Sequence, residues 1–266
     1  MKTTYRSLAF ALFPVLVLSV PISLFAQSPF DGTWHTNMDQ SKMSPKPIVV
    51  SLKNGMYDCS SCNPQIHVKA DGQDQSVTGQ SYDTISVREI DSKTIEVKGK
   101  KSSKPVYEQT RTVSDDGKNL RLKSTSYRPG NDQTVTAEVT YARISKAPAG
   151  ANGTSGSWRV NKVNLSENGV TTSYKSNGDD LTMSTPAGEG YTAKLDGKDY
   201  PYKGTFSYDA VSLKRINDRT IEETDKLDGK VTQVSKMSVS TDGKTLTVVS
   251  TYMPTNRTST YISSKQ

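Results

Sequence analysis

The chain has 266 residues, of which 33% are hydrophobic and 23% charged, and its formal net charge is +7. Lysine and aspartate alternate along the sequence and form no basic stripe with interleaved aromatic residues, so we expect no nucleic-acid partner. Large apolar residues are too few for a large α/β core, and this composition suits small barrels or thin sandwiches.

Residues 1–26 have the three-part pattern of a secretory signal peptide. Lys2 and Arg6 precede an apolar run from Leu8 to Val20, and Ala26 is a small residue that suits cleavage. A retained membrane anchor is the alternative, which the shortness of the run disfavours. No later stretch is long and apolar enough to span a membrane as a helix, and the many charged residues disfavour an outer-membrane barrel. We therefore predict a periplasmic or secreted protein with no membrane span after signal cleavage. Because two basic residues and no acidic ones precede the cleavage point, the mature chain carries a formal charge of +5.

An internal repeat is the strongest signal in the rest of the chain. Ser81–Glu96 aligns without a gap to Ser207–Glu222, and Val113–Lys118 aligns to Val239–Lys244 at the same offset. The repeat predicts two copies of one module. Between the copies lies a segment of small residues, Gly and Pro, which is typical of a flexible connector. The predicted organisation is a signal peptide over 1–26, a first β module over 27–146, a linker over 147–156 and a second β module over 157–266.

Each copy has the pattern of an antiparallel β protein. Asn-Gly and Asp-Gly pairs, which favour tight hairpin turns, recur along both copies, for example at 54–55 and 228–229. Short runs between them, such as Thr84–Ile90 and Lys244–Val249, alternate apolar and polar residues, as strands with one buried face do. No window after the signal segment has the apolar stripe of a helix. We predict an all-β fold with about eight strands per module, each module an up-and-down barrel, with a β-sandwich as the alternative.

Three sequence segments resemble those of a known group of proteins. Phe30–Trp34 contains the Gly-x-Trp that opens the first strand of lipocalin-like and other calycin barrels, and the second copy has Gly156-Ser157-Trp158. Together with Val68–Asp74 and Tyr191–Pro201, it resembles secreted bacterial proteins with lipocalin-like modules and no assigned activity. The resemblance implies a small β-barrel and a periplasmic or secreted location, and it carries over no catalytic residues.

Cys59 and Cys62 form the one cysteine pair of the chain, and a C-x-x-C pair has three interpretations here. The first is a structural disulfide, as an oxidising compartment allows. The second is a redox-active dithiol, which in thioredoxin-type sites stands at a helix N-terminus that this sequence does not offer. The third is half of a metal site with His67, which lacks a fourth ligand. We expect the structural disulfide, no metal and no cofactor; covalent haem is excluded because Asn63 stands where a histidine would be needed.

No catalytic constellation is apparent, so we do not expect an enzyme. Strand alternation predicts that His35 and His67 both point outward, and neither has a neighbour that would make a nucleophile–base pair. Most aspartates stand in turns that explain them. Equivalent strand carboxylates such as Glu96 and Glu222 are explained as solvent-facing positions of the repeat.

Aromatic residues are the better ligand candidates, because they combine apolar rings with polar tips. The candidate ligand-binding residues are Trp34, Tyr57, Tyr82, Trp158, Tyr191 and Tyr208. We predict an exported, monomeric, non-catalytic protein that binds a small amphipathic or apolar ligand. One alternative is a periplasmic interaction or inhibitor module whose partner is an envelope protein, and another is a thiol–disulfide active protein that uses Cys59 and Cys62. Because Met56–His67 has no counterpart in the second copy, we expect the distinctive function in the first copy.

Overall fold

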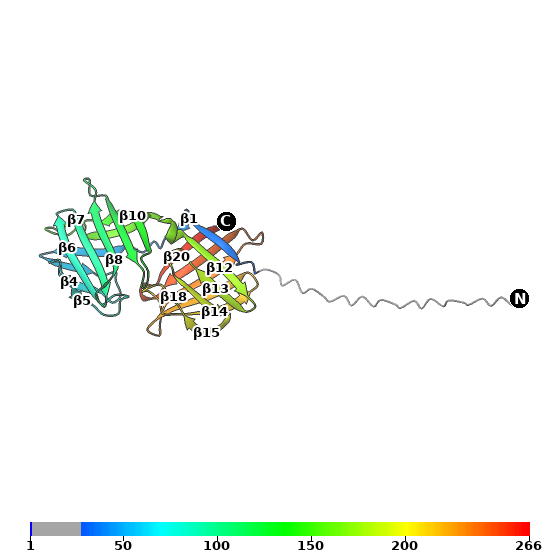
Figure 1. Ribbon diagram of the computed structural model, residues 1–266. Coiled ribbons are helices and arrows are strands. Elements are labelled where there is room, and N and C mark those ends of the chain that lie inside the picture. Colours follow the sequence, from blue (N-terminus) through cyan, green and yellow to red (C-terminus); the bar gives the residue numbers. More distant parts are fainter. Residues whose placement is uncertain (2–27) are drawn as a thin grey trace.

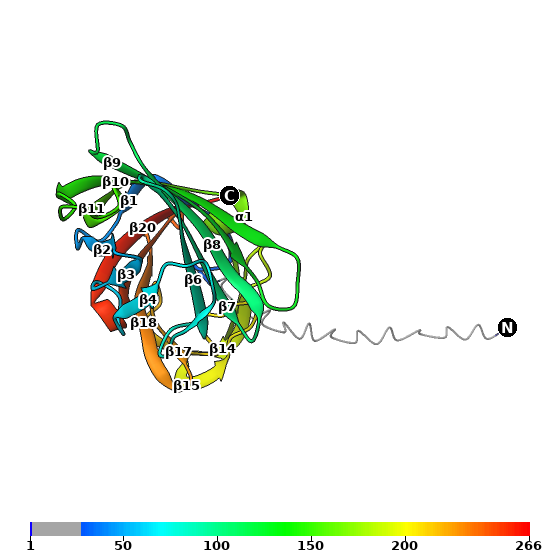
Figure 2. The same ribbon diagram turned by 90° about the vertical axis from the view of Figure 1, so that its left-hand side faces the viewer.

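The computed structural model describes Met1 and residues 28–266, so the expected signal segment lies, apart from Met1, outside the described residues. The described chain is all-β, and it forms two ten-stranded antiparallel sheets that each roll into a nearly closed barrel (Figures 1 and 2). The predicted fold class and the barrel architecture are therefore confirmed. No helix among the described residues is long and apolar enough to cross a membrane.

The first barrel is built from strands that follow one another along the chain. It contains β2 (Ile48–Lys53), β3 (Met56–Cys59), β4 (Ile66–Lys69), β5 (Gln75–Ser76), β6 (Thr84–Asp91), β7 (Thr94–Lys101), β8 (Lys104–Val113), β9 (Asn119–Tyr127), β10 (Thr134–Ser145) and β11 (Gly156–Leu165). Their order in the sheet is β4-β3-β2-β11-β10-β9-β8-β7-β6-β5, so β11 lies between β2 and β10, and the seam lies between β4 and β5.

The second barrel combines the first strand of the chain with the last nine. It contains β1 (Gly32–Lys42), β12 (Thr171–Asn177), β13 (Asp180–Ser184), β14 (Gly190–Lys194), β15 (Asp196–Pro201), β16 (Ala210–Asn217), β17 (Thr220–Leu227), β18 (Lys230–Val239), β19 (Thr245–Tyr252) and β20 (Arg257–Lys265). Two short helices, α1 (Glu167–Val170) and the 3₁₀ turn η1 (Met253–Thr255), connect elements. The sheet order is β14-β13-β12-β1-β20-β19-β18-β17-β16-β15, which is the order of the first barrel with β1 in the place of β11.

The two copies have therefore exchanged their opening strands. In a simple tandem arrangement β1 would lie next to β2 and β10, but β1 pairs with β12 and β20, and β11 pairs with β2 and β10. In Figure 1 the blue β1 accordingly lies beside the red β20. The division between the barrels does not follow the sequence boundary at 147–156, since the first barrel spans β2 to β11 without interruption. Both opening strands carry Gly-x-Trp, and they occupy equivalent places in the two sheets.

Residues 152–156 of the predicted linker are packed into the first barrel, whereas 148–150 are exposed, so the second half of the segment is not the flexible connector that we expected. Asn152 is 6% exposed, and its Nδ2 donates to Glu89 Oε1 at 2.8 Å and to the Asp91 carbonyl oxygen at 2.7 Å. The buried Ser155 Oγ accepts the backbone N–H of Leu52 at 2.8 Å. The small polar residues that suggested flexibility instead fit inside the barrel, where they satisfy backbone and side-chain groups.

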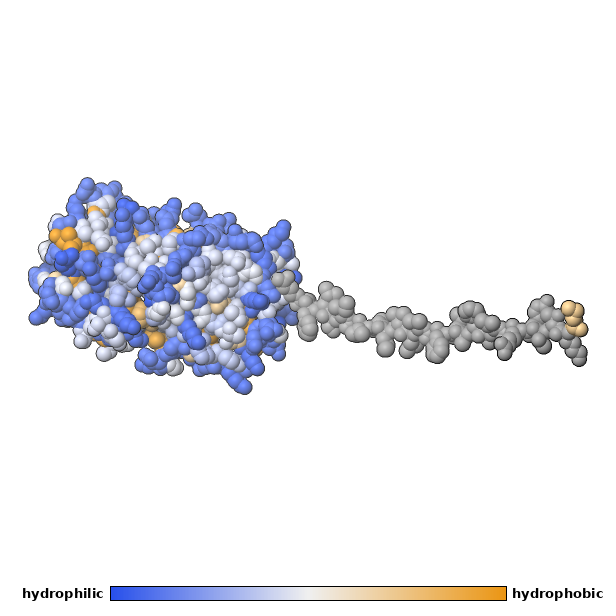
Figure 3. All heavy atoms as spheres, in the orientation of Figure 1, coloured by the Kyte–Doolittle hydropathy of each residue, from blue (hydrophilic) through white to orange (hydrophobic). Residues whose placement is uncertain are grey.

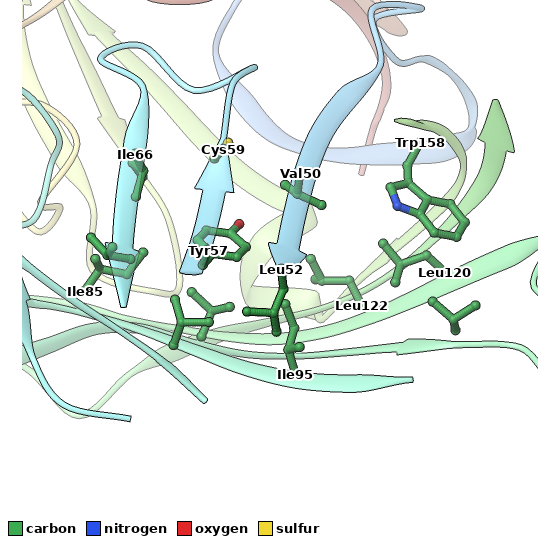
Figure 4. Close-up of a cluster of buried hydrophobic side chains, with 14 of the residues drawn as sticks. Val50, Leu52, Tyr57, Cys59, Ile66, Ile85, Ile95, Leu120, Leu122 and Trp158 are labelled. Carbon is green, nitrogen blue, oxygen red and sulfur yellow. The ribbon is translucent and has the colours of Figure 1, made fainter. Parts of the chain in front are cut away.

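Alternating side chains of both sheets form the two cores. In the first barrel, Val50, Leu52, Ile95 and Leu122 point inward and meet across the barrel (Figure 4). The face of the barrels that Figure 3 shows is predominantly hydrophilic. One buried face per strand is what the period-two pattern of the sequence predicts.

Each tryptophan of the Gly-x-Trp pair closes one end of a barrel. Trp34 Nε1 donates to the Phe30 carbonyl oxygen at 2.8 Å, and Trp158 Nε1 donates to the Thr154 carbonyl oxygen at 2.9 Å. Both indoles are fully buried. Gly156 has φ +123°, and a Cβ there would lie 2.7 Å from the Ser145 carbonyl oxygen, so this position requires glycine. Trp34 lies in the second barrel because its strand does, which differs from the predicted module.

The barrels also contact one another through their loops. The η1 turn of the second barrel lies against the first barrel: Arg257 Nη2 donates to the Pro47 carbonyl oxygen at 2.6 Å, and Asn63 Nδ2 donates to the Pro254 carbonyl oxygen. In the other direction, the β9–β10 hairpin of the first barrel reaches the second, where Arg128 Nε lies 2.8 Å from Glu189 Oε1. Strand exchange and reciprocal loop contacts therefore join the two barrels.

Candidate functional site

The two barrel interiors carry different ionisable residues, each at a position where the other barrel has an uncharged residue. On β8, Arg111 points inward, and the repeat offset of 126 places Met237 at the same position of β18. On β7, Val97 and Gly99 point inward, and their counterparts on β17 are Glu223 and Asp225. The common scaffold therefore surrounds a cation in the first barrel and two carboxyl groups in the second.

Arg111 is held in the first barrel by neutral partners. Its Nη1 donates to Tyr57 Oη at 3.0 Å, and its Nη2 donates to Gln109 Oε1 at 2.9 Å. Its Nε is closed off from solvent and has no hydrogen-bond partner. Burial opposes the charged form, but the phenol oxygens of Tyr57, Tyr141 and Tyr107 favour it, and the pKa of Arg111 is raised. Arg111 is therefore a cation at any physiological pH.

Arg111 lines a cavity of about 280 Å³ between the first barrel and the η1 turn of the second. Among the described residues, no aspartate, glutamate or histidine lines it. The lining residues are Ile48, Val50, Cys59, Ser61, Cys62, Asn63, Gln80, Gln109, Arg111, Leu122, Tyr141, Tyr252, Thr255 and Arg257. The cavity thus combines aliphatic walls with a few polar groups, as small-molecule sites do.

Two of the residues that line this cavity each have a buried polar atom without a hydrogen-bond partner. The described residues contain four buried side-chain nitrogen or oxygen atoms that lack a hydrogen-bond partner, and two of them, Arg111 Nε and Thr255 Oγ1, belong to cavity-lining residues. Larger hollows of about 590 and 790 Å³ lie over the outer face of β7–β11 and at the Phe30 end of the second barrel. Neither of these has such an atom among its lining residues. Because unpaired buried polar atoms are costly, the smaller cavity has the strongest demand for a polar ligand.

The predicted disulfide between Cys59 and Cys62 is present, with an S–S distance of 2.04 Å, and it forms part of the cavity wall. Cys59 is 5% exposed and belongs to the first-barrel core. His67, the third member of the metal hypothesis, points to the outer face, where its Nδ1 contacts Asp58 Oδ1. The structure thus does not bring His67 together with the two cysteines. His35, which also points outward, lies 3.4 Å from Glu167.

Two carboxyl groups lie inside the second barrel. Glu223 is 9% exposed and Asp225 is 1% exposed. Tyr191 donates its hydroxyl to Glu223 Oε2, and Gln233 Nε2 donates to Asp225 Oδ2 at 3.2 Å, whereas Asp225 Oδ1 has no partner. Burial, assisted by the neighbouring Glu223, raises the pKa of Asp225 to about 9. Burial also raises the pKa of Glu223, although the Tyr191 hydroxyl opposes this shift.

Tyrosine rings surround these carboxyl groups. Tyr191 and Tyr202 meet edge to face with centroids 5.4 Å apart, and Tyr202 and Tyr208 lie at the same distance. Tyr174 donates its hydroxyl to Met237 Sδ at 3.6 Å. Burial raises the pKa of all four tyrosines, so their hydroxyl groups stay protonated at neutral pH. At neutral pH the four tyrosines and Asp225 of the second interior are therefore protonated.

The six predicted ligand residues do not form one site. Trp158, Tyr57 and Tyr82 lie in the first barrel, and Trp34, Tyr191 and Tyr208 lie with the second. None of them lines the cavity, although Tyr57 is bonded to Arg111, and Tyr82 packs edge to face on Tyr107 at 5.2 Å.

The sequence interpretation missed Arg111 and Tyr141, which do line the cavity. A signal for Arg111 was present, because it has the same strand parity as the apolar Val113. The general rule that charged strand residues face solvent conceals this signal. The contribution of Tyr252 and Thr255 could not be seen from local patterns, because it depends on how the second barrel packs on the first.

No protein-family model matches the sequence, and neither a curated protein nor a solved structure matches it.

Proposed function

We propose that this protein is a non-catalytic binding protein that holds one small amphipathic ligand in the cavity of the first barrel. The observation that carries the proposal is the cavity itself, in which aliphatic walls from Ile48, Val50 and Leu122 meet two unpaired polar atoms. A small barrel has room for one small ligand, and the volume of about 280 Å³ fits a short-chain amphiphile rather than a large cofactor.

The groups around the cavity favour binding over catalysis. A general acid or base must lie within hydrogen-bond reach of the substrate. Among the described residues, the lining set contains no aspartate, glutamate, histidine or lysine. Its one exposed hydroxyl near the disulfide, Ser61 Oγ, is engaged with the backbone of Val49. The remaining candidates for chemistry are the disulfide and the hydroxyls of Tyr141 and Tyr252, whose pKa values are raised by burial, so neither tyrosine is a ready general base at neutral pH.

The pattern of residues 1–26 and the resemblance to secreted lipocalin-like proteins support an exported protein as part of this proposal. The disulfide is consistent with an oxidising compartment. Intact-mass measurement of protein from the cell envelope tests this part directly, since cleavage after Ala26 predicts a defined mature mass. An uncleaved chain in the cytoplasm would contradict it.

The binding proposal is tested by native mass spectrometry and by titration with short amphiphiles. We expect saturable binding of one molecule per chain from a panel of octanoate, 1-octanol and octylamine. Leu122→Phe, which fills the cavity, should weaken binding about tenfold or more, because a bulky group in the cavity displaces the ligand.

Val248→Phe is the matched control for this experiment. Val248 occupies the position of Leu122 in the second barrel, where Met237 is its Cα partner, as Arg111 is for Leu122. This variant should bind like wild type. Absence of binding to every member of the panel, or equal affinity for wild type and Leu122→Phe, would refute the proposal.

A further inference from the structure

We infer that the ligand is an anionic amphiphile whose carboxylate, or a similar monoanionic head group, binds to the guanidinium of Arg111. This inference rests on the proposed function, because it names the chemistry of the ligand that the cavity takes. The inference starts from the guanidinium of Arg111, which lies inside the barrel and has no counter-charge. Among residues 28–266, no aspartate or glutamate lines the cavity around it.

The unpaired Nε distinguishes Arg111 from the second arginine of the cavity. Arg257 stands at the mouth, where both of its terminal nitrogens donate to backbone carbonyl oxygens of Lys46 and Pro47. Arg111 instead keeps its Nε without a partner in a closed environment. A buried charge is tolerated when it is paired, and its pairing with a ligand anion would relieve the cost that the empty protein carries.

The neutral partners of Arg111 suit the binding of an anion. Tyr57 Oη accepts from Arg111 Nη1, so the hydroxyl hydrogen of Tyr57 is left to donate to another acceptor. Gln109 Oε1 accepts from Nη2 and fixes the plane of the guanidinium. Both partners orient the cation without neutralising it. Charge-assisted hydrogen bonds between arginine and carboxylate are about twice as strong as neutral ones, which makes an anion the preferred occupant.

The second barrel shows that the scaffold does not require this arginine. At the position of Arg111 it has Met237, and each lies opposite an isoleucine of the neighbouring strand. At the position of Tyr57 it has Leu181, as the matching strand registers show. Both members of the Arg111–Tyr57 pair are thus replaced together by apolar residues on the same fold. A role limited to folding would not explain why the first barrel alone carries the pair, whereas recognition of an anion does.

The aliphatic wall supplies the other half of the ligand. Ile48, Val50 and Leu122 line the same cavity, and the disulfide adds a further apolar surface. A head group at Arg111 therefore places a short apolar chain against these residues, under the roof that Tyr252 and Thr255 of the second barrel form. Each methylene of such a chain that leaves water favours binding, so a chain of moderate length is sufficient for measurable affinity.

The test compares three isosteric probes that differ in head-group charge: octanoate, 1-octanol and octylamine. Wild-type protein should bind octanoate about 10-fold to 100-fold more tightly than 1-octanol, and octylamine least tightly, by isothermal titration calorimetry at pH 7.5. Arg111→Met, which copies the residue of the second barrel, should abolish the preference for octanoate while 1-octanol still binds. Arg121→Met is the charge-matched control, because Arg121 lies on the outer face of the same barrel and pairs with Glu138 at 2.7 Å.

The outcomes separate this inference from the proposed function. If wild-type protein binds 1-octanol as tightly as octanoate, the cavity binds ligands but the anion inference is wrong. If Arg111→Met keeps the preference for octanoate, Arg111 is not the head-group site. If wild-type protein binds none of the three probes, the proposed function itself fails. Thermal unfolding of Arg111→Met shows whether the variant is folded, and the presence of Met237 in the equivalent core predicts that it is.

Discussion

Trp34, in the first strand of the chain, has Lys265, in the last strand, as its Cα partner, and Lys265 Nζ lies 5.2 Å from the centre of the indole ring. The equivalent Trp158 lies beside β2, opposite Ile48 of the first barrel. The two positions together define the strand exchange. A duplicated chain that had kept its modules separate would have brought Trp34 next to Ile48 instead. The first barrel is consequently inserted between β1 and β12, and two chain segments, 43–47 and 166–170, connect it to the second barrel.

An engineered cross-link tests the exchange. Thr36 and Ser263 are Cα partners on β1 and β20, and their hydroxyl oxygens lie 3.0 Å apart. The double variant Thr36→Cys/Ser263→Cys should form an intramolecular disulfide, because the two side chains already touch. Peptide mapping by mass spectrometry identifies the bond. Thr36→Cys with Tyr141→Cys is the contrasting pair, since Tyr141 opposes Val160 of β11 and would meet Thr36 only in unexchanged modules.

Stability should fall as the pH rises, because of the carboxyl groups in the second barrel. Folded Asp225 holds its proton up to a pKa of about 9, whereas an unfolded aspartate loses it near pH 4. The contribution of Asp225 to the free energy of unfolding is therefore greatest below about pH 4. It falls by up to about 1.4 kcal/mol per pH unit as the pH rises towards 9. Asp225→Asn should flatten this dependence, so that its urea midpoint exceeds that of wild type at pH 8. Asp132→Asn, at an exposed loop position, is the control and should leave the pH dependence of the wild-type protein unchanged. A urea midpoint of the wild-type protein that does not change with pH would contradict the prediction.

The ion pair between the barrels should contribute more than an ordinary surface pair. Arg128 and Glu189 have side-chain exposures of 12% and 22%, and the two atoms lie 2.8 Å apart. Glu189→Gln should lower the free energy of unfolding by about 1–3 kcal/mol, because it leaves a mostly buried guanidinium without its counter-charge. A double-mutant cycle with Arg128→Met measures the coupling from chemical unfolding curves. Coupling below about 0.5 kcal/mol would place this pair with exposed ones such as Lys198–Asp196.

The disulfide should stabilise the fold and shape the cavity. Replacement of both Cys59 and Cys62 by Ala should lower the free energy of unfolding by about 2 kcal/mol, the value expected for a short closed loop. Affinity for the amphiphile should also fall, since both residues line the cavity. Urea unfolding and ligand titration of the same variant measure the two effects. The thiol–disulfide alternative predicts instead that the native protein exchanges rapidly with glutathione, which is measured by alkylation and mass spectrometry.

The fold class was predictable from the sequence because it depends on local signals. The Asn54-Gly55 pair predicts a turn, and alternating apolar and polar residues predict strands such as β7. The repeat offset then identifies the equivalent strands of the two barrels. The partners of β1 were not predictable. Its sequence suits either barrel equally, so the choice depends on the connecting segments and on contacts between barrels, which local patterns do not encode.

The candidate site was only partly predictable for a related reason. The Cys59–Cys62 pair was identified because cysteine spacing is a local signal. Arg111, Glu223 and Asp225 were not identified from the sequence, since charged side chains on alternating strands are most often exposed. Their burial follows from barrel closure, which turns one face of every strand into an enclosed interior. The signal of both polar interiors was therefore the presence of charged residues at strand positions in phase with the buried apolar residues.

The exchange of opening strands also sets an order for assembly. The first barrel is complete once β11 has been synthesised, because all its strands lie between Ile48 and Leu165. The second cannot close until β20, the final strand, is available to pair with β1, which was made first. β1 therefore waits unpaired while the whole first barrel folds, and such long-range pairing is slow to form. Since the η1 turn that roofs the cavity belongs to the late barrel, the binding site becomes complete only when the end of the chain has folded.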